Sequence, residues 1–373
     1  MVAAASPRLW DAGCPGGRRG CQVRLVPIGC RPGLGKQQLV LAGFRERFEP
    51  LVARIFPPRI LLVLDDEALT LLGLPGHGFR SGASRLRRVP LPRGACVDGL
   101  PLQKAALGDL IGDLSLEMGL QGAQVVASLP RAASAVRVVQ WPFEEWPEEP
   151  DQALRQIDPD LSLPYPLSQA YLSLTPQDRQ DPLLPLCSLL VTAPRHLVMA
   201  WIEVFAIAEL ALERLEPAQV ADLRAIEPLL VEASADTLIG LLEWRADGAE
   251  LTLVRHGIPE FNRRLPAVAG DLAAALRPCI DFWRRRDPQA GRVRLLVFGS
   301  GGGRGSVAEA LAGDPDWSVE IVDPLERGWL PLEQNPDDPL APADPDGPSL
   351  LRLSGLVRAE PGQQDQAPRE LDR

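Results

Sequence analysis

Short apolar runs of strand length alternate with stretches of helical period along most of the chain. The segment 59–76 predicts two strands joined by a tight turn at Asp65 and Asp66, because both flanks are apolar and β-like. Leucine and isoleucine then recur every three or four residues over 102–120, which predicts an amphipathic helix. A further strand is expected at 134–142, where valine recurs.

The second half of the chain continues this alternation. An apolar run at 185–193 predicts a buried strand, and 194–216 predicts one long helix that opens with a proline. A strand at 236–244 and a hairpin that turns at 255–257 follow, and a terminal helix is expected near the end. Because strands and helices mix throughout, the predicted class is α/β or α+β.

Length and composition restrict the number of folding units and the kinds of partner that the chain can have. At 373 residues the chain exceeds the size at which one core stops growing, so two or more folding units are expected. A formal net charge of -10 disfavours nucleic acid as a partner, because phosphate contacts need a basic surface. No apolar run approaches the roughly 18 residues of a membrane span, so no transmembrane segment is expected.

Cysteine and histidine usage predicts no metal site. The six cysteines and three histidines are scattered, and no CxxC pair occurs, so neither zinc binding nor a disulfide framework is indicated. The chain shows no signal-peptide pattern at Met1, and its cysteines suit free thiols. The expected compartment is therefore the cytoplasm.

A cluster of four glycines raises the question of a nucleotide site. Gly299, Gly301, Gly302 and Gly303 lie between an apolar run and a helix-like stretch, in LLVFGSGGGRGSVAEAL (295–311). Backbone amides of such a turn can approach anionic oxygens closely, because glycine has no side chain. The same glycines suit a tight strand-to-helix turn, so the cluster alone leaves both interpretations open.

Four stretches, in a fixed order, carry a resemblance to a known family. They are VPLPRGACVDGLPLQKAALGDLI, GLQGAQVVASLPRAASAVRVVQWP, DPDLSLPYPLSQAYLSL and RVRLLVFGSGGGRGSVAEALAGDPDWSVEIVDPLE. Their order and spacing, over roughly Arg59 to Glu360, resemble the type IV pilus assembly protein PilM family of the actin-like ATPase superfamily. The resemblance implies an α/β, actin-like (ribonuclease H-like, duplicated) two-lobed fold with an inserted small α+β domain.

With this resemblance the chain divides into seven expected parts. They are an appended or poorly ordered segment (1–58), a first actin-like lobe (59–143), the inserted small α+β domain (144–217), a second actin-like lobe (218–330) with a return helix at 218–235, a linker (331–348), a terminal helix (349–360) and a disordered tail (361–373).

Actin-like ATPases grip phosphates and metal with two Asp-x-Gly hairpins, and both grips are altered here. The resemblance places Asp65 on the first aspartate, but Asp66 and Glu67 follow in place of glycine and would repel phosphates. On the second hairpin Glu243 keeps a carboxylate, whereas Arg245 would put a long side chain where backbone should touch phosphate. The glycine cluster keeps the shape of the family's third, adenosine-side turn.

The resemblance therefore implies a cytoplasmic scaffold of type IV pilus assembly with a degenerate nucleotide cleft. In the family, a groove captures the cytoplasmic N-terminal peptide of the membrane protein PilN, so a PilN-like partner and peripheral association with the inner membrane are implied, with the pilus platform and motor contacted indirectly. The partner-binding residues are not predicted.

The alternative function is a working ATP-binding protein or ATPase switch. Its candidate nucleotide-binding residues are Gly299, Gly301, Gly302, Gly303, Asp65 and Glu243, with ATP and Mg²⁺ as the cofactors. An unrelated enzyme ranks last, because the chain shows no Ser/His/Asp order, paired acidic motif or HExxH signature, and no catalytic residue or metal ligand is predicted.

Overall fold

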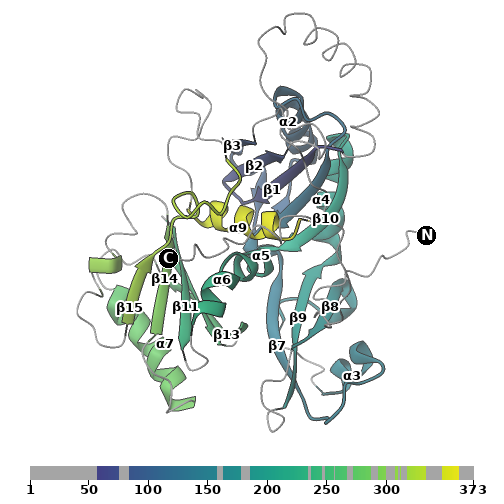
Figure 1. Cartoon of the computed structure of the whole chain (residues 1–373). Helices are drawn as coiled ribbons and strands as arrows, with labels where there is room; N and C mark the ends of the chain where they lie inside the picture. The colour runs from purple at the N-terminus through teal and green to yellow at the C-terminus, as the bar shows by residue number, and fades with distance from the viewer. Residues whose placement is uncertain are drawn as a thin grey trace, which may run out of the picture. The chain divides into compact units, whose positions relative to one another are not determined.

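Two five-stranded sheets of the same topology form the framework of the chain (Figure 1). The computed structural model describes residues 57–74, 84–157, 163–177, 185–233, 237–245, 248–255, 257–266, 272–286, 293–299, 307–309, 311, 317–332 and 347–360. All of them belong to one unit, Phe56–Arg373, and only this unit is described.

The first sheet extends an antiparallel hairpin with two parallel strands, in the order β10-β6-β1-β2-β3. β1 pairs antiparallel with β2 and parallel with β6, which confirms the predicted hairpin with its turn after Leu64. β1 is buried along almost its whole length, as expected of a strand covered on both faces. The strands are β1 (Arg59–Leu64), β2 (Ala68–Leu74), β3 (Arg85–Pro90), β6 (Gln124–Leu129) and β10 (Ala211–Pro217).

The second sheet repeats this arrangement, in the order β13-β12-β11-β14-β15. β11 pairs antiparallel with β12 and parallel with β14, as β1 does with β2 and β6. The predicted turn at 255–257 is confirmed, since Arg255 pairs with Ile258. The strands are β11 (Leu238–Arg245), β12 (Gly248–Arg255), β13 (Ile258–Pro266), β14 (Val293–Gly299) and β15 (Trp317–Ile321).

Helices pack on both faces of the sheets. The predicted helix at 102–120 is confirmed as α2, and with α4 it covers one face of the first sheet. α7 covers the corresponding face of the second sheet. No helix of the described chain is both long and apolar enough to cross a membrane. The bounds are α2 (Lys104–Glu117), α4 (Arg195–Ile207), α5 (Ala218–Ala225), α6 (Glu227–Glu232), α7 (Leu272–Arg286) and α9 (Gly347–Arg358).

A small three-stranded sheet is inserted in the chain between β6 and α4, in the order β7-β9-β8. Trp141 and Leu154 form the centre of its own core, in which α3 packs on the sheet. The turn η1 leads from β6 into this insertion, and β4 and β5 form a two-stranded ladder before α2. The bounds are β4 (Cys96–Val97), β5 (Leu100–Pro101), η1 (Arg131–Ala133), β7 (Ala135–Trp141), α3 (Pro150–Ile157), η2 (Leu167–Gln169), β8 (Ala170–Pro176) and β9 (Leu186–Pro194).

The single long helix expected over 194–216 is wrong. α4 ends at Ile207, Glu209 has a positive φ of 54°, and the chain then forms β10. The residues of β10 favour helix in isolation, but helix propensity is a weak preference. Pairing with β6 overrides it, because the backbone groups on that side of β6 require hydrogen-bond partners.

The return helix expected over 218–235 is divided. α5 ends at Ala225, and α6 begins at Glu227 with Pro228 in its first turn. Proline cannot donate the hydrogen bond that would continue the preceding helix, but it suits the first turn of a new one.

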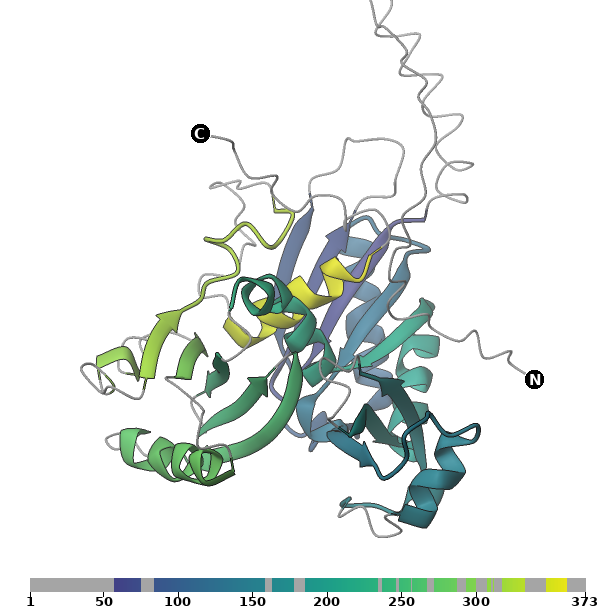
Figure 2. The same cartoon turned by 60° about the horizontal axis from the view of Figure 1, so that its bottom comes forward.

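The terminal helix α9 is buried between the two sheets instead of lying outside them. Every residue from Gly347 to Val357 is buried. Leu353 packs with the core of the first sheet, whereas Leu351 packs with the core of the second. Figures 1 and 2 show α9 crossing between the sheets beside α5 and α6. The last described helix therefore connects the two halves of the fold.

A tight contact with α5 makes Gly355 of α9 sensitive to substitution. A Cβ atom at Gly355 would lie 1.9 Å from the backbone oxygen of Ala221, so Gly355→Ala forces α9 away from α5. Overpacking of this kind is expected to lower the free energy of unfolding by about 1–3 kcal/mol or more. Urea unfolding followed by circular dichroism measures this change.

The matched control is Gly112→Ala, in helix α2. Its added Cβ would lie 3.4 Å from the nearest backbone atom, which is an ordinary contact. This substitution should leave stability unchanged or raise it by up to about 1 kcal/mol through helix propensity. Equal effects of the two substitutions would contradict the packing described for α9.

Candidate functional site

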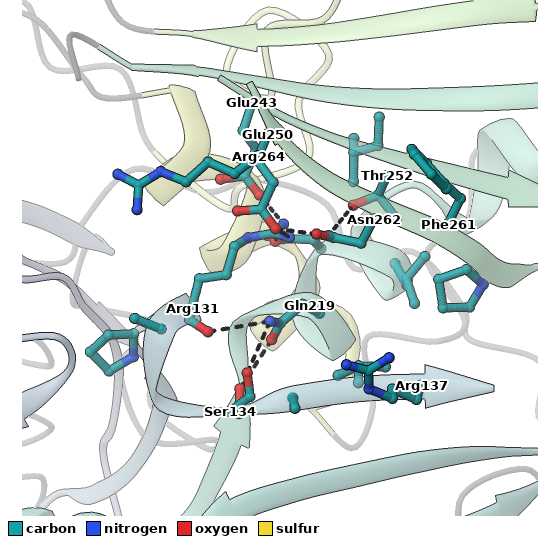
Figure 3. Close-up of a pocket in the computed structure, with 18 of the residues that line it drawn as sticks. Arg131, Ser134, Arg137, Gln219, Glu243, Glu250, Thr252, Phe261, Asn262 and Arg264 are labelled. Atoms are coloured by element: carbon teal, nitrogen blue, oxygen red, sulfur yellow. Dashed lines mark hydrogen bonds and ion pairs between the residues drawn. The ribbon is translucent and has the colours of Figure 1, made fainter. Parts of the chain in front are cut away.

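The parallel strands of both sheets end at one cleft. β1 ends just before Asp65, β6 ends just before the turn η1, and β11 carries Glu243 near its end. Open α/β sheets bind ligands at the carboxyl ends of their parallel strands. The cleft has a volume of about 1020 Å³ and is lined by both hairpins, η1, α5 and the strands β7 and β13 (Figure 3). It is the candidate functional site.

The guanidinium group of Arg352, on α9, lies among three carboxylates from three other elements. Its Nη1 is 3.2 Å from Asp65 Oδ1, its Nη2 is 2.7 Å from Glu243 Oε2, and its Nε is 3.4 Å from Asp222 Oδ1. Ser349, one turn earlier, donates a hydrogen bond of 3.2 Å to Asp65 Oδ2. The Arg352 side chain is fully buried. α9 thus supplies a buried cation where the carboxylates of the two hairpins converge.

A second arginine, Arg131 of η1, binds two of the same carboxylates. Its Nη2 is 2.7 Å from Asp222 Oδ2 and also pairs with Glu243, while its Nη1 is 2.9 Å from Glu250 Oε1. Asn262 of β13 donates a hydrogen bond of 2.7 Å to the same oxygen of Glu250. Figure 3 shows Arg131 directed from the first sheet toward the hairpin of the second. Both arginines pair with Asp222 of α5 and with Glu243 of the second sheet, so they connect the two sheets to each other and to α5.

Burial controls the protonation of this network. It raises the pKa of Asp222 to about 8, against the attraction of Arg352, and the carboxylate of Glu243 raises it further. Burial thus opposes ionisation of Asp222, whereas its ion pairs with Arg352 and Arg131 favour it. Because the folded-state pKa lies above the unfolded value, the stabilisation from this proton is complete at acidic pH and is lost as the pH rises through about 8.

The structure joins Asp65 and Glu243, the two candidate carboxylates, through one guanidinium group. Gly299 is the last residue of β14, and a Cβ on Gly347 would lie 2.7 Å from its backbone oxygen, so α9 begins directly against it. The other candidates, Gly301, Gly302 and Gly303, lie outside the described residues. The nucleotide-binding role of all these residues stays a prediction.

Sequence reasoning missed Arg131, Asp222 and Arg352. A signal for one of them existed, because Arg352 is the only charged residue within the apolar stretch SLLRLSGLV. A charged residue in an otherwise buried helix is almost always paired. The other two gave no such signal, since Arg131 follows a proline in a turn and Asp222 lies in a short polar helix.

Asp66, expected to repel phosphates, has a structural role in the fold. Its Oδ1 accepts hydrogen bonds from the backbone nitrogen of Gly99 at 2.8 Å and from the thiol of Cys96 at 3.1 Å. Burial, together with Asp66, raises the pKa of Cys96, so this cysteine stays a neutral thiol. Asp66 therefore anchors the β4–β5 ladder to the first hairpin.

A divalent cation between Asp65 and Glu243 does not fit this arrangement. Magnesium needs oxygen ligands at about 2.0–2.1 Å, whereas here the guanidinium of Arg352 lies between the two carboxylates. In the part of the chain that the structure describes, no group of three or more His, Cys, Asp or Glu side chains is placed to hold a metal ion.

Two duplicated sheets that share a cleft, with a small inserted sheet, define an actin-like fold, as the sequence resemblance implied. The solved structure of a PilM–PilN type IV pilus biogenesis complex matches with a TM-score of 0.59 at 22% identity, covering 81% of this chain and 99% of that chain. At this identity the likeness shows the fold. The fold resemblance to PilM is thereby confirmed.

Two further solved structures match more weakly. The cytoplasmic domain of EpsL, an inner-membrane component of the type II secretion system of Vibrio cholerae, gives a TM-score of 0.43 at 11% identity, covering 80% of this chain and 95% of that chain. A Bacteroides thetaiotaomicron protein with an actin-like ATPase fold and unknown function gives 0.44 at 9% identity, with coverages of 73% and 93%. No protein-family model and no curated protein matches the chain.

Removing the Arg352 cation should destabilise the fold strongly. Arg352→Met leaves the buried carboxylates of Asp65 and Glu243 without this partner, and breaking such a pair costs about 3–5 kcal/mol. The control is Arg294→Met, which removes a pair with Glu320 whose side chains are 26% and 27% exposed. The control should cost about 0–1 kcal/mol. Similar urea midpoints for the two variants would contradict the structural role of Arg352.

Proposed function

We propose that this chain is a scaffold of a type IV pilus assembly complex that binds a PilN-like inner-membrane protein. The observation that carries the proposal is the match to a PilM–PilN complex over 81% of this chain and 99% of that chain. Near-complete coverage means that the inserted sheet and both lobes have counterparts, so the same kind of assembly is available to this chain. The chain acts at the cytoplasmic face of the membrane, held there by its partner.

The same proposal includes a degenerate nucleotide cleft. Three observations support it. Arg352 lies where a metal between Asp65 and Glu243 would have to lie. α9 begins against Gly299, and Asp66 is committed to the β4–β5 ladder. Each of the three positions that actin-like ATPases use toward a nucleotide thus contacts other parts of this chain.

The partner is tested by co-expressing the chain with a PilN-like membrane protein from the same genome. The expected result is co-purification in detergent, and membrane sedimentation of the chain only when the partner is present. The matched control is the partner without its cytoplasmic N-terminal segment, which should leave the chain in the supernatant. If the chain stays in the supernatant with both forms of the partner, the proposed function is wrong.

An ATP-binding function is the second candidate, because Asp65 and Glu243 line the cleft at the carboxyl ends of their strands, and Gly299 ends the neighbouring strand β14. Calorimetric titration with Mg-ATP distinguishes the two. A degenerate cleft predicts no heat of binding at micromolar concentrations. Micromolar binding that Gly301→Leu or Gly302→Leu abolishes would instead establish a working nucleotide site.

A further inference from the structure

The two large sheets are connected where the helices α5 and α9 cross. α5 follows β10 of the first sheet and leads through α6 to β11 of the second, and α9 passes between the sheets beside it (Figures 1 and 2). A Cβ atom on Gly355 would lie 1.9 Å from the backbone oxygen of Ala221, so the two backbones touch at the crossing. Domains that move relative to each other rotate about a few residues of this kind. The crossing is therefore the axis about which the cleft would open.

Arg352 forms its ion pairs beside this axis. It lies one turn before Gly355 on α9, and its partner Asp222 directly follows Ala221 on α5. Groups close to an axis move little when two bodies rotate about it. The pairs of Arg352 therefore hold the centre of the fold together, whereas the angle between the sheets depends more on contacts farther from the crossing.

Arg131 makes such a contact across the cleft. It extends from η1, at the end of the first sheet, to Glu243 of β11 and Glu250 of β12 in the second (Figure 3). α9 begins against Gly299 of β14, and β12 lies on the other side of β11 from that strand. The pair with Glu250 thus joins the sheets on the side of β11 away from the start of α9.

Both ends of this contact are fixed. On the first sheet's side, the Gln219 amide of α5 donates a hydrogen bond of 3.3 Å to the backbone oxygen of Arg131, and its oxygen accepts one of 3.1 Å from the Ser134 hydroxyl. On the far side, Asn262 donates a hydrogen bond of 2.7 Å to the Glu250 oxygen that Arg131 binds. The Arg131 side chain is only 12% exposed. Opening the cleft would therefore separate buried charges from their partners, which is unfavourable.

We propose that Arg131 is an ionic clasp that holds the two large sheets at a fixed angle about the α5–α9 crossing. The sheets keep this angle whether or not a nucleotide is offered, because both charges of every pair belong to the chain. The clasp involves only residues of this chain, so it does not depend on the membrane partner. Any partner consequently meets one fixed surface instead of a surface that changes as the cleft opens and closes.

The test is the distance between the two sheets, measured by double electron–electron resonance on the full chain. Spin labels are attached at two exposed positions, Asp113 of α2 and Asp281 of α7, through a ketone-bearing amino acid that spares the native cysteines. With Arg131 present, the clasp predicts one narrow distance distribution that saturating Mg-ATP leaves unchanged. Arg131→Gln should broaden the distribution and shift it by more than about 2 Å, the size of a domain rearrangement.

A second variant and a matched control complete the test. Glu250→Gln removes one pair of Arg131 and keeps the more deeply buried ones, so it should broaden the distribution less than Arg131→Gln does. The control is Arg294→Gln, which removes a pair of similar exposure between β14 and β15 of the same sheet. It should leave the distribution unchanged.

Two results overturn the clasp. One is a narrow, unshifted distribution in Arg131→Gln, or in Glu250→Gln if Arg131→Gln does not fold. The other is a distribution that is broad, or that moves with Mg-ATP, while Arg131 is present. Binding of Mg-ATP without any change in the distance supports the clasp and contradicts only the degenerate cleft, so the two proposals fail separately.

Discussion

The ion pairs of one buried arginine hold the two halves of this fold together. Arg352 contacts Asp65 from the first sheet, Glu243 from the second and Asp222 from the helix between them. A buried guanidinium is tolerated only when several carboxylates compensate its desolvation, and the carboxylates equally need the cation. The placement of α9, the approach of the two hairpins and the polar floor of the cleft all depend on this mutual compensation.

The ion pairs of Arg352 also determine the charge balance of the cleft. Asp65, which follows β1, and Glu243 of β11 bring two carboxylates to one cleft. Two carboxylates at close range need a cation, and here the protein supplies it from its own last described helix. Arg131 adds a second guanidinium from η1, which pairs with Glu243 and Asp222. The buried carboxylates of the cleft are thereby paired with cations that belong to the fold.

The inserted small sheet is held together by apolar contacts at its centre. Its core is separate from those of the two large sheets, and its outer strand β7 faces the cleft with a valine-rich edge. The ionic network thus lies between the two large sheets, whereas the core of the insertion is apolar.

By itself the sequence determined the elements whose signals are local. Apolar periodicity and turn residues within a few positions predicted the hairpin at Asp65, helix α2, strand β7 and the turn at 255–257. The order of the four motifs indicated the actin-like fold. Tertiary structure decided the rest. Residues 211–217 form β10 because pairing with β6 outweighs their helix propensity. Arg352 lies 287 positions from Asp65 and 109 from Glu243, so no local pattern relates these three residues. Their contact exists only because packing of α9 between the sheets removes water from the charges and makes each require the others.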